Sequence, residues 1–313
     1  MLDEIKQNLT LPVIVAPMFL VSQPALVIEC CKAGIVGSFP ALNQRTSAGY
    51  REWLEQIQAE LGEGDAPFAV NLIVHKTNPR LAADLELTVE HKVPIVITSL
   101  GAATEVVDAV HSYGGLVLHD VITTNHAQKA LAAGVDGLIA VCAGAGGHAG
   151  SYNPFAFISE LRAITDKPIL ASGCISNGAS ILAAQAAGAD LAYMGTRFIA
   201  AQESMASDAY RSMMINSEAK DIIYTPKVSG VNANFMMPSI EAAGLDLDST
   251  PTPTMNAEKE LNSEAKAWKD VWSAGQGVGA ISAVEPVADI VQNLKREYRA
   301  ALDALNTSAS AYL

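Results

Sequence analysis

The chain has 313 residues, of which 50% are hydrophobic and 17% charged, so it can bury a large core and is not globally disordered. Its 20 Lys and Arg residues against 33 Asp and Glu residues give a formal net charge of -13. This charge argues against nucleic acid or an anionic membrane surface as a partner. It leaves open a small anionic ligand that is held by local dipoles.

The first residues, MLDEIKQNLT, carry acidic side chains and no apolar signal core. No stretch reaches the ~18 apolar residues of a membrane-spanning helix. The four cysteines are Cys30, Cys31, Cys142 and Cys174, and no C-x-x-C pair occurs among them. Neither a disulfide framework nor a zinc site is indicated. We therefore expect a cytoplasmic protein without a metal site.

Eight short apolar runs recur along the chain, and stretches with helical spacing lie between them. The runs cover residues 12–17, 35–39, 67–73, 94–99, 115–120, 136–141, 168–173 and 190–195. Strands that are hydrophobic throughout are typical of parallel sheets covered on both faces, and eight such units predict a (β/α)8 TIM barrel. An open doubly wound sheet is the alternative. Its glycine fingerprint should follow the first strand, where this chain has APMFLVSQP instead.

The alternation stops near residue 205. Residues 206–279 contain polar, Pro-containing loops such as DLDSTPTPT, and we expect them to form a cap or lid inserted after strand eight. The segment EPVADIVQNLKREYRAALDAL then resumes helical spacing and is expected to supply the last barrel helix. We thus expect residues 1–205 and 280–313 to make one barrel. In the cap, NANFMMPSI could line a substrate pocket or simply pack, and Phe235, Met236 and Met237 are given no role.

The loops after strands seven and eight contain small residues where TIM barrels often bind phosphate. They begin SGCISNG (172–178) and GTRF (195–198), and both turns are expected to open helices. Glycine permits close backbone approach, and N–H groups at the start of a helix favour a phosphate. Each turn alone could be an ordinary strand-to-helix connection, but the pair favours a phosphate site.

The segment CAGAGGHAG (142–150) follows strand six and surrounds His148 with four glycines. So many glycines cost conformational entropy unless something must approach the backbone. A histidine titrates near neutrality, which suits a base or a hydrogen-bond donor; a satisfied histidine in a flexible loop is the alternative. The other histidines lack such surroundings and are interpreted as mostly structural or solvent-facing: His75, His91, His111, His119 and His126.

Two further strand ends offer groups for a flat ligand. Ala16, Pro17 and Met18 place rigid backbone after strand one, and Asn71 on strand three offers a donor and an acceptor, although a lone buried Asn usually satisfies backbone groups. Other barrel chemistries fit less well. Strands six and seven lack the lysine of a Schiff-base aldolase, and the strand ends lack clustered His and carboxylate ligands for a metal hydrolase.

The order and spacing of these motifs resemble the nitronate monooxygenase family over nearly the whole chain. The motifs are APM (16–18), VNL (70–72), AGAGGHAG (143–150), ASG (171–173) and MGTRF (194–198). In addition, AGQGVG (274–279) is similar to the family's segment that returns to the flavin.

The resemblance implies a barrel with flavin mononucleotide (FMN) at its mouth. Ala16, Pro17, Met18 and Asn71 would hold the isoalloxazine ring, with Gly146 approaching it. The ribityl phosphate would lie among Ser172, Gly173, Met194, Gly195 and Thr196. His148 would face the substrate, as binding group for a nitronate or as base towards a nitroalkane. The implied reaction oxidises alkyl nitronates, with propionate 3-nitronate as one candidate, by oxygen to a carbonyl compound and nitrite.

Two rival functions stay open. One is an NADH-dependent flavin reductase of the same superfamily, acting on a quinone or an enoyl thioester. The other is a noncatalytic flavin-binding protein. An oligomer is compatible with each of them.

Four positions depart from the family pattern. Gly144 stands where many relatives have an acid, Val141 where relatives often carry Gln, and Cys174 where a second Gly is common. Asp120 stands where some reductases of the superfamily have Lys. An ionised aspartate there would oppose the negative charge of a reduced flavin. Either Asp120 points elsewhere or the electronics of the flavin differ.

Overall fold

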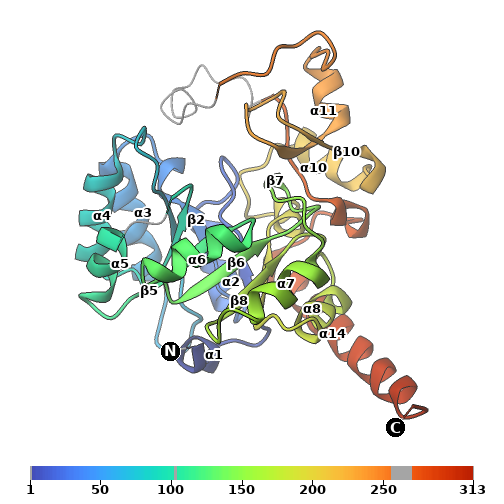
Figure 1. Ribbon diagram of the computed structural model, residues 1–313, viewed down its shortest axis with the longest axis horizontal. Helices are drawn as coiled ribbons and strands as arrows, with labels where there is room; N and C mark the ends of the chain where they lie inside the picture. Colours follow the sequence, from blue (N-terminus) through green and yellow to red (C-terminus); the bar gives the residue numbers. More distant parts are fainter. Residues whose placement is uncertain (1, 102–103, 255–269, 313) are drawn as a thin grey trace.

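The computed structural model describes residues 2–101, 104–254 and 270–312. Its centre is an eight-stranded parallel sheet with the order β1-β9-β8-β6-β5-β4-β3-β2 (Figure 1). The strands are β1 (Val13–Val15), β2 (Ser38–Pro40), β3 (Ala69–Ile73), β4 (Ile95–Ser99), β5 (Leu116–Val121), β6 (Gly137–Val141), β8 (Ile169–Ser172) and β9 (Leu191–Met194). A parallel bridge between Ile14 and Val36 joins β1 to the segment before β2. The predicted TIM barrel is confirmed.

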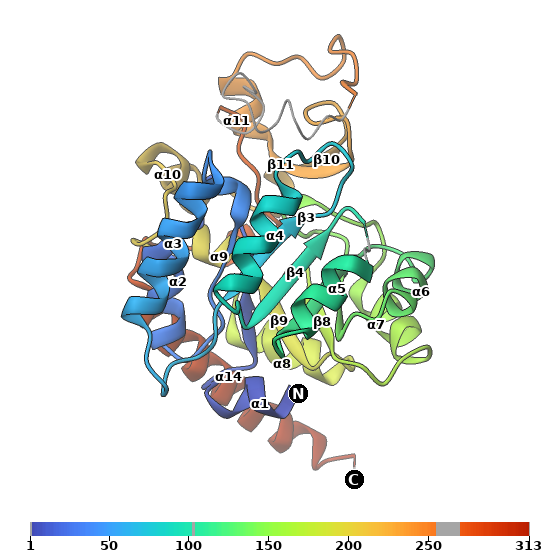
Figure 2. The ribbon, with the colours of Figure 1, turned by 90° about the vertical axis from the view of Figure 1, so that its left-hand side faces the viewer.

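Helices alternate with the strands and cover the outside of the sheet (Figure 2). They are α2 (Pro24–Lys32), α3 (Ser47–Glu60), α4 (Leu81–Glu90), α5 (Thr104–His111), α6 (Thr124–Ala132), α7 (Pro154–Arg162) and α8 (Gly178–Ala186), after a short α1 (Leu2–Gln7). The predicted last helix is present as α14 (Val287–Ala309), which packs against both α8 and α2. The chain therefore completes its ring of helices with its C-terminal segment.

The contact between α8 and α14 is very close at one glycine. The backbone N–H of Gly178 donates to Glu297 Oε2 at 2.8 Å. A Cβ at Gly178 would lie 2.2 Å from the backbone N of Tyr298 and 2.4 Å from the carbonyl O of Leu294. A side chain has no room here because backbone atoms of α14 occupy the space.

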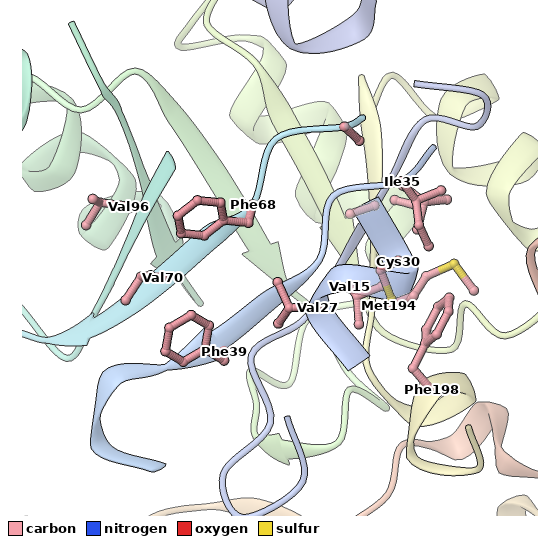
Figure 3. Packing of buried hydrophobic residues seen from close by; sticks show 14 of the residues in the cluster. Val15, Val27, Cys30, Ile35, Phe39, Phe68, Val70, Val96, Met194 and Phe198 are labelled. Atoms are coloured by element: carbon pink, nitrogen blue, oxygen red, sulfur yellow. The ribbon is translucent and has the colours of Figure 1, made fainter. Parts of the chain in front are cut away.

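Two hydrophobic clusters follow from the alternation of strand residues between the two faces of the sheet. Inside the barrel lie alternate residues such as Ile14, Ile97, Ile139, Leu170 and Leu191. Between the barrel and the helices lie their neighbours, including Val15, Val70, Val96 and Met194 (Figure 3). These two packed layers fix the strands whose carboxyl ends carry the polar residues of the site.

Residues 206–254 and 270–279 lie at the end of the barrel opposite α1 (Figure 1). They contain α10 (Asp208–Ile215), β10 (Ile222–Thr225), β11 (Ala233–Met236) and α11 (Met237–Ala242), with 3-10 turns at Ala219–Asp221 and Gln276–Ala280. β11 pairs antiparallel with β10 and with β7 (Gly147–His148), a two-residue strand after β6. Residues 255–269 of the expected cap lie outside the described residues, so the division into barrel and cap stays a prediction.

Candidate active site

A cavity of about 820 Å³ opens at the carboxyl ends of the barrel strands. Small-molecule and cofactor sites typically measure roughly 300–1,000 Å³. Every residue predicted for the site lines this cavity except Met194: Ala16, Pro17, Met18, Asn71, Gly146, His148, Ser172, Gly173, Gly195 and Thr196. The fold thus brings together segments that are up to 180 residues apart in the chain.

Met194 lies elsewhere. Its side chain is 1% exposed and packs outside the barrel with Cys30, Ile35 and Phe198 (Figure 3). Its carbonyl accepts a hydrogen bond from Ala16 N at 2.9 Å. Along β9 the inward position belongs to Tyr193, which lines the cavity. We therefore exclude the Met194 side chain from the binding site.

The loop after β8 and the end of β9 offer backbone donors to the cavity. Within the described residues, the N–H groups of Gly173, Cys174, Ile175 and Gly195 have no hydrogen-bond acceptor, and all four residues line the cavity. Gly173 and Cys174 have φ values of +119° and +59°, a turn that L side chains rarely adopt. Unpaired N–H groups that converge on a cavity are what an anionic phosphate requires.

The start of α8, by contrast, is occupied by the chain itself. Asn177 Oδ1 accepts from Ser180 N at 2.8 Å, and Glu297 accepts from Gly178 N. The expectation that the first turn of this helix supplies phosphate donors is therefore corrected. The open donors lie in the loop that precedes α8, not in its first turn.

The segment around residue 275 closes one wall of the cavity. Gly275 N donates to Thr196 Oγ1 at 2.9 Å, and Gln276 N donates to the Gly144 carbonyl at 2.9 Å. A Cβ at Gly146 would lie 2.9 Å from Gly275 N. Glycine is thus required at position 146 by the approach of the chain's own backbone, whatever ligand fills the cavity.

His148 lies on β7, opposite Ala233 of β11. The preceding residue, Gly147, has a φ of +69° and donates its N–H to Ser273 Oγ at 2.6 Å. His148 Nε2 lies 3.4 Å from Ser229 Oγ, and that hydroxyl donates to the Val231 carbonyl at 3.0 Å. Ser229 therefore acts as the acceptor towards His148, which assigns the ring hydrogen to Nε2 and the lone pair to Nδ1.

Burial lowers the pKa of His148 below its ordinary value of 6.5. The charged imidazolium loses solvation in the cavity wall, so the neutral ring is favoured. At neutral pH the side chain therefore presents a neutral imidazole, which can accept a proton or share a hydrogen bond.

A row of inward-facing polar residues crosses three neighbouring strands, from Asn71 on β3 through Ser99 on β4 to Asp120 on β5. Asn71 Nδ2 donates to the Ile97 carbonyl at 3.1 Å and to Ser99 Oγ at 2.8 Å. The Ser99 hydroxyl donates to Asp120 Oδ2 at 2.5 Å. All three residues line the cavity, so Asp120 does not point elsewhere.

The sequence reasoning did not single out Ser99 or Tyr193, nor did it select His119 as a lining residue. Tyr193 and Ser99 are the inward residues that end β9 and β4, so the two-residue period of a strand would have identified both. His119 is buried, with its Nδ1 2.7 Å from Thr98 Oγ1. Burial lowers the pKa of His119 to about 4.

Within the described residues, no group of three or more His, Cys, Asp or Glu side chains is placed to hold a metal ion. In the same part of the chain, no helix has both the length and the apolar character needed to cross a membrane. The barrel, the open backbone donors and the partly buried imidazole together indicate an enzyme with a cofactor-sized cavity at the carboxyl ends of its strands.

The chain belongs to the nitronate monooxygenase family, a family of oxidoreductases, which matches residues 80–297. A nitronate monooxygenase from Paraburkholderia phytofirmans is 29% identical, over 96% of this chain and 95% of the relative. One from Pseudomonas aeruginosa is 28% identical, over 92% and 96% of the two chains.

Solved structures give the same picture of the fold. The nitroalkane oxidase from Streptomyces ansochromogenes is 25% identical and has a TM-score of 0.82, with 96% of this chain and 99% of that chain covered. FabK from Thermotoga maritima has a TM-score of 0.85 at 23% identity over 98% of both chains. This second likeness concerns the fold alone.

Proposed function

We propose that the protein binds FMN in the cavity and oxidises alkyl nitronates with molecular oxygen to a carbonyl compound and nitrite. The observation that carries the proposal is the meeting, in one cavity, of open backbone donors and a partly buried neutral imidazole in a chain of the nitronate monooxygenase family. Two relatives that bear that family's name align over more than nine-tenths of both chains. Propionate 3-nitronate is the first substrate to test.

The residues present fit FMN at both of its ends. The N–H groups of Gly173, Cys174 and Gly195 suit the phosphate. Asn71 uses both amide hydrogens within the chain, so the group it has left for a heterocycle edge is the acceptor oxygen. Ala16, Pro17 and Met18 provide a flat, mostly apolar wall for the ring. When bound, FMN supplies the two-electron acceptor that the reaction needs and passes the electrons to oxygen.

We assign His148 as the residue that contacts the substrate. The lone pair on Nδ1 can accept a proton from the α-carbon of a nitroalkane, and the Nδ1–H formed in this way can donate a hydrogen bond to an oxygen of the nitronate. Ser229 orients the ring, and the pairing of β7 with β11 fixes the backbone that carries it. Burial keeps the imidazole in the neutral form that a base requires.

The test compares wild type with His148→Asn in the flavin-loaded protein. Oxygen consumption and nitrite release with the nitroalkane 3-nitropropionate should fall by about 10²- to 10⁴-fold in the variant, the range for loss of a positioned base. With propionate 3-nitronate, which has no α-proton to give up, the fall should be smaller. FMN content should stay unchanged. His75→Asn is the matched control, because His75 makes a local contact with Thr77 and does not line the cavity.

Anaerobic mixing separates the rival functions. Nitronate alone should bleach the flavin absorbance. Bleaching by NADH with no response to nitronate would identify a reductase instead. A protein that binds FMN but turns over neither donor, before and after substitution of His148, would be a noncatalytic flavin-binding protein.

A further inference from the structure

Asp120 has one carboxylate oxygen for which the chain provides no partner. Oδ2 accepts the hydrogen of the Ser99 hydroxyl, whereas Oδ1 is buried and has no hydrogen-bond partner among the described residues. A buried acceptor that lacks a partner is destabilising, because it loses its hydration without gaining a hydrogen bond. Asp120 lines the cavity, so a ligand there could supply the missing contact.

The hydrogen bonds of the row decide where a proton on Asp120 would lie. The Ile97 carbonyl can only accept, so it fixes the orientation of the Asn71 amide and makes Nδ2 the donor to Ser99. Ser99 accepts that bond and has one hydrogen, which it donates to Asp120 Oδ2. A proton taken up by Asp120 therefore sits on Oδ1, the oxygen without a partner, where it becomes a hydrogen-bond donor.

Among the residues that the structure describes, no cation contacts the carboxylate of Asp120. The titratable group that interacts with it is Tyr193 from β9. His119, next to it on β5, points to the opposite face of the sheet, where its ring is bound to Thr98. His126 and Lys129 of α6 and His148 of β7 line other parts of the cavity. Burial raises the pKa of Asp120 to about 6, and the Ser99 hydrogen bond only partly offsets this.

A ring system that fills the cavity displaces the water around the partly exposed Asp120 side chain and increases the desolvation of its carboxylate. We propose that Asp120 takes up a proton on Oδ1 when the cavity is filled and donates it in a hydrogen bond to an acceptor atom of the bound flavin ring. The identity of this ligand rests on the proposed function. Asp120 thereby contacts the cofactor directly, as a neutral carboxylic acid that donates a hydrogen bond.

The test measures proton uptake when FMN binds. Full-length protein is freed of flavin, checked for its fold by circular dichroism, and titrated with FMN in buffers of different ionisation enthalpy. At about pH 8, two units above the pKa of about 6, wild type should take up close to one proton more per FMN than Asp120→Asn. Titration of the FMN phosphate contributes equally to both and cancels.

Two variants give the matched controls. Asp120→Asn can still accept from Ser99 and donate from its amide, so its FMN affinity should match that of wild type within about 2-fold at low pH. Asp120→Ala loses the donor and should bind FMN about 2- to 10-fold more weakly. Asp108→Asn, which removes an exposed carboxylate on α5, should take up as many protons as wild type.

Infrared difference spectra provide a second measurement, which detects the protonated carboxyl group directly. Loading with FMN should produce the C=O band of a protonated carboxylic acid, and Asp120→Asn should lack it. Equal proton uptake in wild type and Asp120→Asn, or no acid band in wild type, overturns the role of Asp120 while leaving FMN binding intact. Failure of every variant to bind FMN would instead overturn the proposed function, and the ligand named here with it.

Discussion

Replacement of Gly178 by Ala should strongly destabilise the barrel, because the added methyl group collides with backbone atoms. The Cβ would lie 2.2 Å from Tyr298 N, 2.4 Å from the Leu294 carbonyl O and 2.7 Å from the Glu297 carbonyl C. Backbone atoms cannot rotate aside as a flexible side chain can, so α8 and α14 must separate. Overpacking of this kind costs about 1–3 kcal/mol.

The separation also breaks the hydrogen bond from Gly178 N to Glu297 Oε2, which is 2.8 Å long. A bond to a charged group contributes about 1.5–3 kcal/mol. Together these effects predict a loss of about 3–5 kcal/mol in the free energy of unfolding. This is a large fraction of the 5–15 kcal/mol typical of folded proteins.

Urea unfolding followed by far-UV circular dichroism measures the loss. Gly64→Ala is the control, since a Cβ there meets no atom within 4 Å and Gly64 does not have a positive φ. The control should unfold within about 0.5 kcal/mol of wild type. A Gly178→Ala protein as stable as the control would show that the tight contact between α8 and α14 does not hold the barrel closed.

Two further predictions concern the site and its neighbours. Thr196→Val removes the acceptor of the Gly275 N–H, a buried hydrogen bond of 2.9 Å. It should lower the free energy of unfolding by about 1–3 kcal/mol, measured by thermal melting, and weaken FMN binding, measured by flavin fluorescence. Thr196→Ser should retain both the stability and the FMN affinity. His119 has a folded-state pKa of about 4 against 6.5 when unfolded, so the unfolded chain binds the proton first and stability is lost as pH falls from 6.5 towards 4. The loss in the free energy of unfolding should approach about 3 kcal/mol. Urea unfolding at several pH values should show this loss in wild type and a smaller loss in His119→Gln. An equal dependence of stability on pH in the two proteins would contradict the low pKa of His119.

The barrel could be predicted because its signal is local. Each strand is a short, buried apolar run bounded by turn residues, and the count of eight decides between a closed and an open sheet. The second strand was the least well placed, because residues 35–37 precede β2 and only Val36 bridges to Ile14. The eighth barrel helix was also found, since its helical spacing survives the interruption by the cap.

The small sheet of β10, β11 and β7 could not be predicted in the same way. β7 has two residues, and its partner β11 lies some 85 positions further along the chain. No local sequence pattern therefore predicts that the two strands pair. Met194 shows another limit: the motif that contains it was recognised, but the direction of its side chain follows from strand alternation and was not considered. The role of Gly146 was attributed to an approaching ligand, whereas residues 274–275 already occupy that space.

The antiparallel pairing of β11 with β7 has a consequence for redesign of the enzyme. The strand that carries His148 is hydrogen-bonded to β11 and follows the barrel strand β6 in the chain. A mutation that shifts β11 therefore moves the imidazole as well as the wall of the cavity. Libraries that vary the cap to admit bulkier substrates should leave Ala233 and Asn234 intact, because otherwise selectivity and turnover change together and neither can be tuned separately.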